Sequence, residues 1–596
     1  MSASPGCGAD WRRLGLLAGF AALVGFLAFI YLGVPLLPKQ SDSAWYYAGT
    51  HYIETGNYVW ESFYPSFEGP SQYYPLGGYS LIILAARGVA SVIGADWVAV
   101  LRVMQFTAYV LTGSLVYAIA TLLSGRRTGA AAALLYFASF PFLNYAALVM
   151  SENMACLLIT AFTFLFLYGL AHDRRWPVYL SFFLAGYTVL LKTVLLGVLP
   201  LLLAAAVIYD WKARRWGHWA LLLAALAACP AAQSITNRFI YGNYRIVSGL
   251  GLHLCDRILL ADKSIPVDLQ WPLGAGRAEY VPVELAMSQG SPALRRLAKE
   301  LQSRAPRYIA VNSGRLAKQL VFMGYPREQI EPTRQAVATD LLATRDVKFV
   351  PIDTAIASGS PAFRRLAQDL QQRRLQFIAL GTWWDLGEQL SPLGYTMNQV
   401  EEFCWNISVD ALKENKTKYV FNTFAMATKV LFREKELYPT RVYRTYREDF
   451  AWLAAFDDEP MQRPLGEALL RSQEGMFDSD DSGHPPLDLY NGFSDAFMKV
   501  QAFGLQTLIA GSYLMWSLVI IAQTIGRRQR RQLLPLAVVL LPALVVLGSC
   551  ATEVLEARYR LPVQPLLIVA CCLLIADGSS RVARRLRPER PPSSPI

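Results

Sequence analysis

Four charged residues are candidates for chemistry at the boundary between lipid and water. The first is Asp42, which comes five residues after an apolar run over residues 14–37 and just before the aromatic run Trp45-Tyr46-Tyr47. A carboxylate placed there could serve as the base of an enzyme whose substrate is linked to a lipid. Asp42 could also be a solvated loop acid, and this stretch alone does not decide between the two.

The other three charged residues lie in short polar segments between apolar runs. These segments are Ser151-Glu152-Asn153, Leu191-Lys192-Thr193 and the loop 552–560, which contains Arg558. A carboxylate and two cations could take up a proton and disperse the charge of a leaving phosphate. Structural roles are equally open: Glu152 as a helix N-terminal acid, Lys192 as a snorkelling side chain, and Arg558 as the partner of Glu553 or Glu556.

Arg87 and several tyrosines form a second group of candidates. Arg87 interrupts the apolar run 76–94. A charge in such a place needs a partner, which could be a lipid phosphate or a neighbouring carboxylate. Tyr46, Tyr73 and Tyr74 could contact substrate, although tyrosines next to apolar runs more often form the aromatic belt of a membrane protein.

The composition is that of a protein that crosses the membrane many times. Hydrophobic residues make up 54% of the 596 residues, and long uncharged runs recur along the chain. The net charge of +11 does not indicate nucleic acid as a partner, because many basic residues cluster in short loops between the runs. The first run follows Arg12 and Arg13, is too long for a signal peptide and lacks a cleavage site, so we expect an uncleaved helix.

The basic loops determine the expected topology. If the run 76–94 lies on the membrane surface or re-enters it, every arginine-rich loop and the basic tail fall on the cytoplasmic side. About ten helices of roughly 20 residues then cross the membrane, with both termini cytoplasmic. The loop 38–75 and the region 237–500 lie outside. The candidate helices cover residues 14–37, 76–94, 99–123, 130–147, 154–171, 178–191, 194–208, 219–235, 503–525, 533–547 and 562–576.

The outer region contains an internal repeat, with copies at residues 281–331 and 350–401. The segment Gly-Ser-Pro-Ala-Leu-Arg-Arg-Leu-Ala at 290–298 returns almost unchanged at 359–367. Its Ser-Pro pair predicts a helix with serine as N-cap and proline in the first turn. We expect tandem helical hairpins; a βαβ unit with residues 308–311 as a strand is the alternative. The repeat could dock an acceptor or could be a structural cap.

These patterns predict three parts. They are a transmembrane module (1–236), a large, mainly helical extracytoplasmic domain (237–500), and C-terminal transmembrane helices with a basic tail (501–596). Cys255 and Cys404 lie in the middle part and could form a disulfide if that part faces an oxidising compartment. The sequence contains no CxxC motif and no mixed set of His and Cys ligands, so we expect no structural zinc site.

The order of the motifs resembles the GT-C glycosyltransferases that use polyprenyl-phosphate sugars. The nearest groups are the lipid A aminoarabinose transferases and the protein O-mannosyltransferase-like enzymes. The likeness covers residues 10–240 well and 500–580 more loosely. It is carried by Asp42 with Tyr46 four residues on, the entry Pro75-Leu76 to a surface helix, Glu152 in the next outer turn, Lys192 beside a threonine, and Arg558-Tyr559-Arg560-Leu561-Pro562 before the last helix.

The resemblance implies an all-α, polytopic GT-C module in the cell (inner) membrane. Such an enzyme would move a hexose or pentose from a polyprenyl-phosphate donor to a glycan, lipid or protein acceptor on the outer face. Asp42 would be the general base, and Glu152 would orient the acceptor or support Asp42. The donor phosphate would contact Lys192, Arg558, Tyr559, Arg87, Tyr46 and Tyr74.

The sequence also departs from the family pattern. Ser43 stands where relatives often have a second acid, so the participation of a divalent cation, Mg or Mn, is left open. Lys192 precedes Thr193, whereas relatives have Thr-Lys-Gly. Two other functions compete with the enzyme: a transporter or lipid flippase, although no inverted repeat of helices is visible, and a scaffold whose catalytic acid has lost its role.

Overall fold

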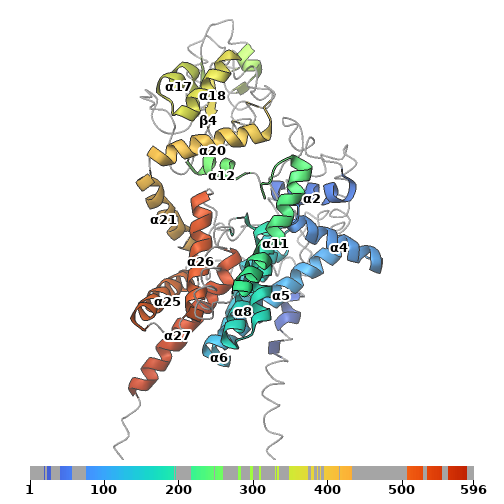
Figure 1. Ribbon diagram of the computed structural model, residues 1–596, viewed down its shortest axis with the longest axis vertical. Helices are drawn as coiled ribbons and strands as arrows, with labels where there is room; N and C mark the ends of the chain where they lie inside the picture. Colours follow the sequence, from blue (N-terminus) through green and yellow to red (C-terminus); the bar gives the residue numbers. More distant parts are fainter. Residues whose placement is uncertain are drawn as a thin grey trace, which may run out of the picture.

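The lower part of the molecule in Figure 1 is a bundle of apolar helices, and a smaller, separate group of helices and strands lies above it. The structure is a computed structural model. It describes residues 19–20, 23–28, 40–56, 76–193, 195, 216–246, 249–258, 280–282, 287, 295–299, 308–310, 329, 332–333, 348–373, 377–380, 386, 390, 395–414, 416–432, 506–527, 533–552 and 561–586.

The bundle is formed by helices from both ends of the chain, and each described helix covers an apolar run that the sequence predicted. Three of them are long and apolar enough to cross a membrane: Trp97–Ser124, Glu152–Ala171 and Gly217–Tyr241. These three make the protein a membrane protein, while the expected total of about ten spans stays a prediction. The helices are α5 (Trp97–Ser124), α6 (Arg126–Ala138), α8 (Glu152–Ala171), α9 (Arg175–Leu191), α11 (Trp216–Tyr241), α25 (Gln506–Arg527), α26 (Leu533–Thr552) and α27 (Gln564–Leu586).

One predicted span, residues 130–147, is divided in the structure. It forms α6 and a short helix α7 (Phe140–Ala146), which are separated by Ser139 in an extended conformation. Pro141 lacks the N–H that would bond to the carbonyl of Phe137, so it disfavours one continuous helix. That carbonyl instead accepts a hydrogen bond from the hydroxyl of Tyr109 at 3.4 Å.

The expected outer loop 38–75 contains a helix. Residues Gln40–Thr55 form α2, so Asp42 lies in the first turn of a helix and not in an extended loop. The segment has no proline or glycine apart from Gly49, which makes a helix possible. Gly56 ends it with a φ of 71° and an N–H that donates to the carbonyl of Tyr52 at 2.9 Å.

The helix predicted for residues 76–94 is present as α4 (Tyr79–Ile93). It has 15 residues, which is shorter than the roughly 20 that a membrane-crossing helix needs. Gly94, with a φ of 68°, ends it. Its exposed side carries Leu81, Val89 and Val92, and it extends away from the bundle at an angle to α5 (Figure 1). An apolar helix of this length with an exposed apolar side fits the expectation of a helix that does not cross.

The upper group contains short strands as well as helices, in contrast to the predicted all-α fold. Two antiparallel pairs form, and in equivalent register: Val281 lies opposite Ile309, and Val350 lies opposite Ile378. The first helix of the expected hairpin is present in the second copy at residues 361–372, and the residues expected to form the second helix lie mostly outside the described part of the chain. Residues 308–310 form a strand, as in the alternative, but the pairing is antiparallel and not parallel. The elements are β1 (Tyr280–Pro282), β2 (Tyr308–Ala310), β3 (Lys348–Pro351), α17 (Ile352–Ser358), α18 (Pro361–Gln372), β4 (Phe377–Leu380), α20 (Met397–Glu414) and α12 (Leu250–Asp256).

The predicted helix start in the second copy is confirmed. Ser360 is the N-cap of α18, and its hydroxyl accepts a hydrogen bond from the N–H of Phe363 at 3.3 Å. Pro361 is the first residue of the helix, where its missing N–H costs nothing. The cap fixes where α18 begins after α17.

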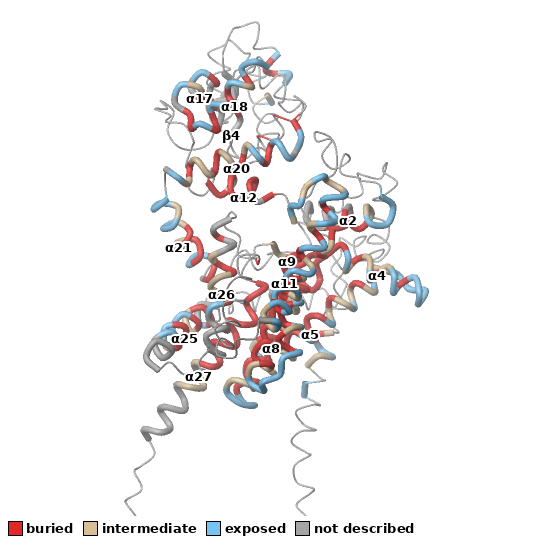
Figure 2. Tube along the Cα trace, viewed as in Figure 1, coloured by how far each residue is buried: buried red, intermediate tan, exposed pale blue. Residues whose placement is uncertain are grey.

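The two parts of the molecule have separate hydrophobic cores, visible as two regions of buried residues in Figure 2. One core runs through the bundle and includes residues of α21 (Lys416–Phe432), such as Val430. The other is built from α12, α17, α18, α20 and the strands β3 and β4, around Phe363 and Leu366. Helix α21 lies between the two parts in Figure 1 and joins the upper group to the bundle.

Helices α9 and α11 approach so closely that one glycine is required. A Cβ added at Gly186 would lie against the carbonyl of Leu226, far inside van der Waals distance. We expect Gly186→Ala to destabilise the protein by about 1–3 kcal/mol, because backbone cannot move aside as a side chain can. The thermal unfolding midpoint in detergent measures the effect.

The matched control is Gly511→Ala in α25, where an added Cβ meets nothing within 4 Å. That change is expected to be neutral or to stabilise by up to about 1 kcal/mol, since alanine favours helix. Equal midpoints for the two variants would contradict the packing described here.

Candidate functional site

The candidate site is centred on a buried ion pair between the facing ends of two helices. Glu152 is in the first turn of α8, and Lys192 directly follows the last residue of α9. The Nζ of Lys192 lies 2.8 Å from Oε1 of Glu152, whose side chain is 0% exposed. An acid at a helix N-terminus and a cation at a helix C-terminus are both favoured by the helix dipoles. Since α8 and α9 are consecutive helices, the chain reversal brings the two charges together.

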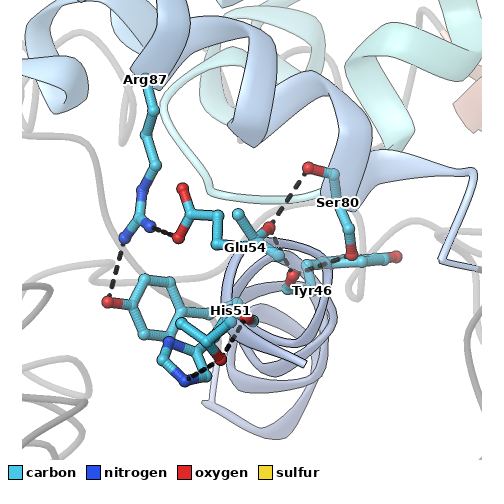
Figure 3. Close-up of polar contacts among 8 residues, drawn as sticks. Tyr46, His51, Glu54, Ser80 and Arg87 are labelled. Carbon is cyan, nitrogen blue, oxygen red and sulfur yellow. Dashed lines mark hydrogen bonds and ion pairs between the residues drawn. The ribbon is translucent and has the colours of Figure 1, made fainter. Parts of the chain in front are cut away.

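A tyrosine attaches α2 to this end of α8. The hydroxyl of Tyr46 is 2.9 Å from the hydroxyl of Ser151, the residue before Glu152. The carbonyl of Tyr46 accepts hydrogen bonds from the hydroxyls of Ser80 at 2.8 Å and Thr50 at 2.9 Å. These contacts link α2, α4 and α8, and Figure 3 shows Ser80 reaching the Tyr46 backbone.

An amide pair continues this network into α5. The Nδ2 of Asn153 donates to the carbonyl and to Oε1 of Gln105, at 2.7 and 2.9 Å. The Nε2 of Gln105 donates to the hydroxyl of Tyr79 at 2.5 Å, and the ring of Tyr79 packs edge-on against that of Tyr46. All four side chains are buried, so the hydrogen bonds fix the start of α8 relative to α2, α4 and α5.

Arg87 has its partners on α2. Its Nη1 forms an ion pair with Glu54, and its Nη2 donates to the hydroxyl of Tyr47 at 3.0 Å. The guanidinium also lies 5.1 Å from the ring centre of Tyr47 and 5.0 Å from that of Trp97. Figure 3 shows Arg87 reaching from α4 to α2. Of the two partners that the sequence left open, the structure places a carboxylate beside Arg87.

The same cluster shifts two pKa values. Burial raises the pKa of Tyr47, and the charge and hydrogen bond of Arg87 oppose that rise. Burial lowers the pKa of His51, and nearby Arg87 lowers it further while Glu54 acts against both. Because its pKa lies below the ordinary value of about 6.5, His51 is neutral at neutral pH and adds no positive charge beside Arg87.

The structure brings together only part of the predicted site. Glu152 and Lys192 are in contact, and Tyr46 is adjacent to them through Ser151. Arg87 belongs to the separate cluster with Glu54. Asp42 is placed by its backbone, one helical turn before Tyr46 in α2. Three predicted residues lie outside the described part of the chain: Tyr74, Arg558 and Tyr559.

Sequence reasoning missed the polar residues that assemble the site. Gln105 is the clearest example, because it is a fully buried amide inside a largely apolar helix that is long enough to cross a membrane. A polar residue inside a membrane helix usually has a specific partner, and that signal was present in the sequence. Ser80 and Thr50 had no such signal, since they lie at helix positions where hydroxyls are common.

Two carboxylates of the site are each paired with a basic side chain of the protein. Glu152 is paired with Lys192, and Glu54 with Arg87. Among the residues that the structure describes, no group of three or more His, Cys, Asp or Glu could hold a metal ion. A divalent cation therefore stays an open hypothesis from the sequence.

A chain of hydrogen bonds leads from the entry of α4 to the upper group. The N–H of Gly77 donates to Oε1 of Gln233 at 2.6 Å, and Nε2 of Gln233 donates to Oδ1 of Asn237 at 2.7 Å. Asn237 donates in turn to the carbonyl of Arg245 at 2.6 Å. The Nη1 of Arg245 lies 3.0 Å from Glu401 of α20. The upper group is thus connected to the site by polar contacts.

The buried pair can be tested by removing one charge at a time. Lys192→Met removes the cation beside a fully buried carboxylate and is expected to cost about 3–5 kcal/mol of stability. Glu152→Gln combined with Lys192→Met should recover most of this loss, because neither charge then remains. Unfolding of Lys192→Met, Glu152→Gln and the double variant in detergent measures the coupling.

The control for this cycle is Lys413→Met, which removes an exposed lysine that lies 3.7 Å from Asp410. An exposed pair contributes about 0–1 kcal/mol, so this variant should unfold near the wild type. If Lys192→Met were as mild as the control, the pair would not hold α8 and α9 together.

Comparisons with known proteins agree with the resemblance on one stretch of the chain. Two solved structures cover 97% of this chain and 82% of their own, each at 12% identity: ArnT from Cupriavidus metallidurans bound to undecaprenyl phosphate, with a TM-score of 0.30, and the same protein in the apo state, with 0.26. Superpositions with scores this low do not establish a common arrangement of the whole chain. No curated protein sequence matches. Residues 81–232 match the family model of the dolichyl-phosphate-mannose-protein mannosyltransferases, which confirms the GT-C resemblance for α4 to α11.

Proposed function

We propose that the protein is a membrane glycosyltransferase that moves a sugar from a polyprenyl-phosphate donor to an acceptor on the outer face of the membrane. The family matched by residues 81–232 is named for a lipid-phosphate sugar donor and a protein acceptor. That name supports the donor class. The acceptor class, whether glycan, lipid or protein, stays open in this proposal, and so does the choice between a hexose and a pentose.

The observation that carries the proposal is the junction of α2, α8 and α9. The contact between Tyr46 and Ser151 holds α2 beside the start of α8, where the Glu152–Lys192 pair is buried. Position 42 is one turn before Tyr46 in α2, and positions four apart lie on the same face of a helix. This arrangement supports a site in which the acid at position 42 and the cation at position 192 act on one substrate.

In the proposed reaction, Asp42 is the general base. It takes the proton of the acceptor hydroxyl while the acceptor oxygen forms a bond to the anomeric carbon of the sugar. The bond between that carbon and the phosphate oxygen breaks, and polyprenyl phosphate leaves with the bonding electrons. Negative charge develops on the phosphate, so a cation beside it lowers the barrier.

We assign this cation to Lys192, positioned by Glu152. An ammonium has three N–H donors, and one of them is directed at Oε1 of Glu152. The side chain of Lys192 is 15% exposed, while that of Glu152 is 0% exposed. The lysine can therefore reach a ligand and the glutamate cannot. In this proposal Glu152 orients the lysine; Arg558 and Tyr559 are further phosphate contacts, assigned from the family resemblance.

Arg87 has a more distant role in the proposed mechanism. Its guanidinium is engaged by Glu54, Tyr47 and Trp97, so it holds α4 against α2. The proposed topology puts α2, the upper group and the facing ends of α8 and α9 on the outer side, and both termini in the cytoplasm.

The proposal is tested with Asp42→Asn in purified full-length protein supplied with polyprenyl-phosphate sugars. An amide cannot accept the proton, so we expect kcat to fall by about 10²–10⁴-fold. Asp42→Glu should retain more activity than the asparagine variant. Transfer is followed as release of polyprenyl phosphate and as labelled acceptor.

The control is Asp173→Asn, in a turn where the residue has a φ of 52° that asparagine also tolerates. It should leave kcat unchanged. Undiminished transfer by Asp42→Asn would refute the base assignment. If the wild-type protein released no polyprenyl phosphate from any such donor, the proposal that it is an enzyme would be refuted.

A further inference from the structure

Two helices of the upper group cross at very short distance. A Cβ added at Gly251 in α12 would be 2.7 Å from the carbonyl oxygen of Glu401 and 3.1 Å from the Cβ of Trp405, both in α20. The N–H of Gly249 also donates to Oε1 of Glu401 at 2.9 Å. The backbones of α12 and α20 are therefore in direct contact at this point.

This crossing brings two cysteine thiols together. Cys255 is one turn after Gly251, and Cys404 lies between Glu401 and Trp405 along α20. Both side chains belong to the same cluster of buried residues in the core of the upper group, and both are free thiols in the structure. Cys255 is 1% exposed and Cys404 is 0% exposed.

Cys255 and Cys404 have no competing cysteine in this part of the sequence. Between α11 and α25 the chain has only these two cysteines, and they are far apart in sequence. An unrelated pair of buried thiols would rarely be the only two available and also be neighbours. Two buried thiols that share one core, on helices whose backbones are in contact one turn away, are placed where a disulfide can form.

We propose that Cys255 and Cys404 form a structural disulfide in the mature protein. The inference rests on the proposed function in one respect, the placement of the upper group on the oxidising side of the membrane. In the reaction each thiol loses its proton, the two sulfurs form one bond, and two electrons pass to a disulfide oxidant, which becomes two thiols.

The bond would form while the upper group folds, before its core closes. In the folded state the hydrogen bond with Cys255, followed by burial, raises the pKa of the Cys404 thiol well above its ordinary range. A thiol that stays protonated and inaccessible reacts slowly. Once formed, the disulfide would be protected from reductants for the same reason.

The position of the disulfide gives it a consequence for the whole molecule. Next to Cys255, the Nε of Arg257 donates to the carbonyl of Cys550 in α26 at 2.9 Å. On the other helix, Glu401 pairs with Arg245. A covalent bond between α12 and α20 would therefore fix the upper group to the segment that contacts the membrane bundle.

The test is made on full-length wild-type protein in native membranes, quenched with acid and denatured before maleimide alkylation. Of the eight cysteines, we expect two more to be alkylated after reduction than before, and mass spectrometry to find the peptides of Cys255 and Cys404 linked. Finding both as free thiols would overturn the proposal.

Variants make the test independent of chance oxidation. Cys404→Ser and Cys255→Ser should each abolish the linked peptide and the reductant-dependent change in gel mobility. Cys229→Ser, in α11, should change neither. Sugar transfer is assayed on the same wild-type sample: loss of transfer with the link present would count against the proposed function and leave the disulfide standing.

Discussion

The arrangement of the site depends on one buried ion pair, Glu152 with Lys192. A fully buried carboxylate is unfavourable unless a cation is held beside it, so α8 and α9 must be antiparallel with these two ends together. The helix dipoles favour the same arrangement. Ser151 and Asn153, on either side of Glu152, then provide the polar groups to which the other elements attach.

Helix α2 is held by specific hydrogen bonds in addition to the burial of Tyr46 and Tyr47 in the core of the bundle. Tyr46 is the centre of these bonds, with its hydroxyl on Ser151 and its carbonyl on Ser80 and Thr50. On the other side of α2, Arg87 of α4 contacts Glu54 and Tyr47. Two sets of directional contacts define the rotation of α2, which an apolar stripe alone would leave less defined.

The two hydrophobic cores are joined through polar groups. Gln233 and Asn237 connect the start of α4 with the end of α11, Arg245 meets Glu401, and Arg257 reaches the carbonyl of Cys550. Hydrogen bonds of this kind determine orientation with little buried area. The upper group has its own core, and these polar contacts hold it in a defined orientation relative to the bundle.

The sequence by itself determined most helices of the bundle, the helix α4 and the serine cap at Ser360, because hydrophobic runs, capping and chain breaks are local. It could not determine that α2 is a helix, that Val281 and Ile309 pair as strands, that Glu54 is the partner of Arg87, or that Cys255 meets Cys404. Each of these depends on which elements lie side by side across long separations in the chain. Only the tertiary structure decides that, through the packing of helices and the pairing of buried polar groups.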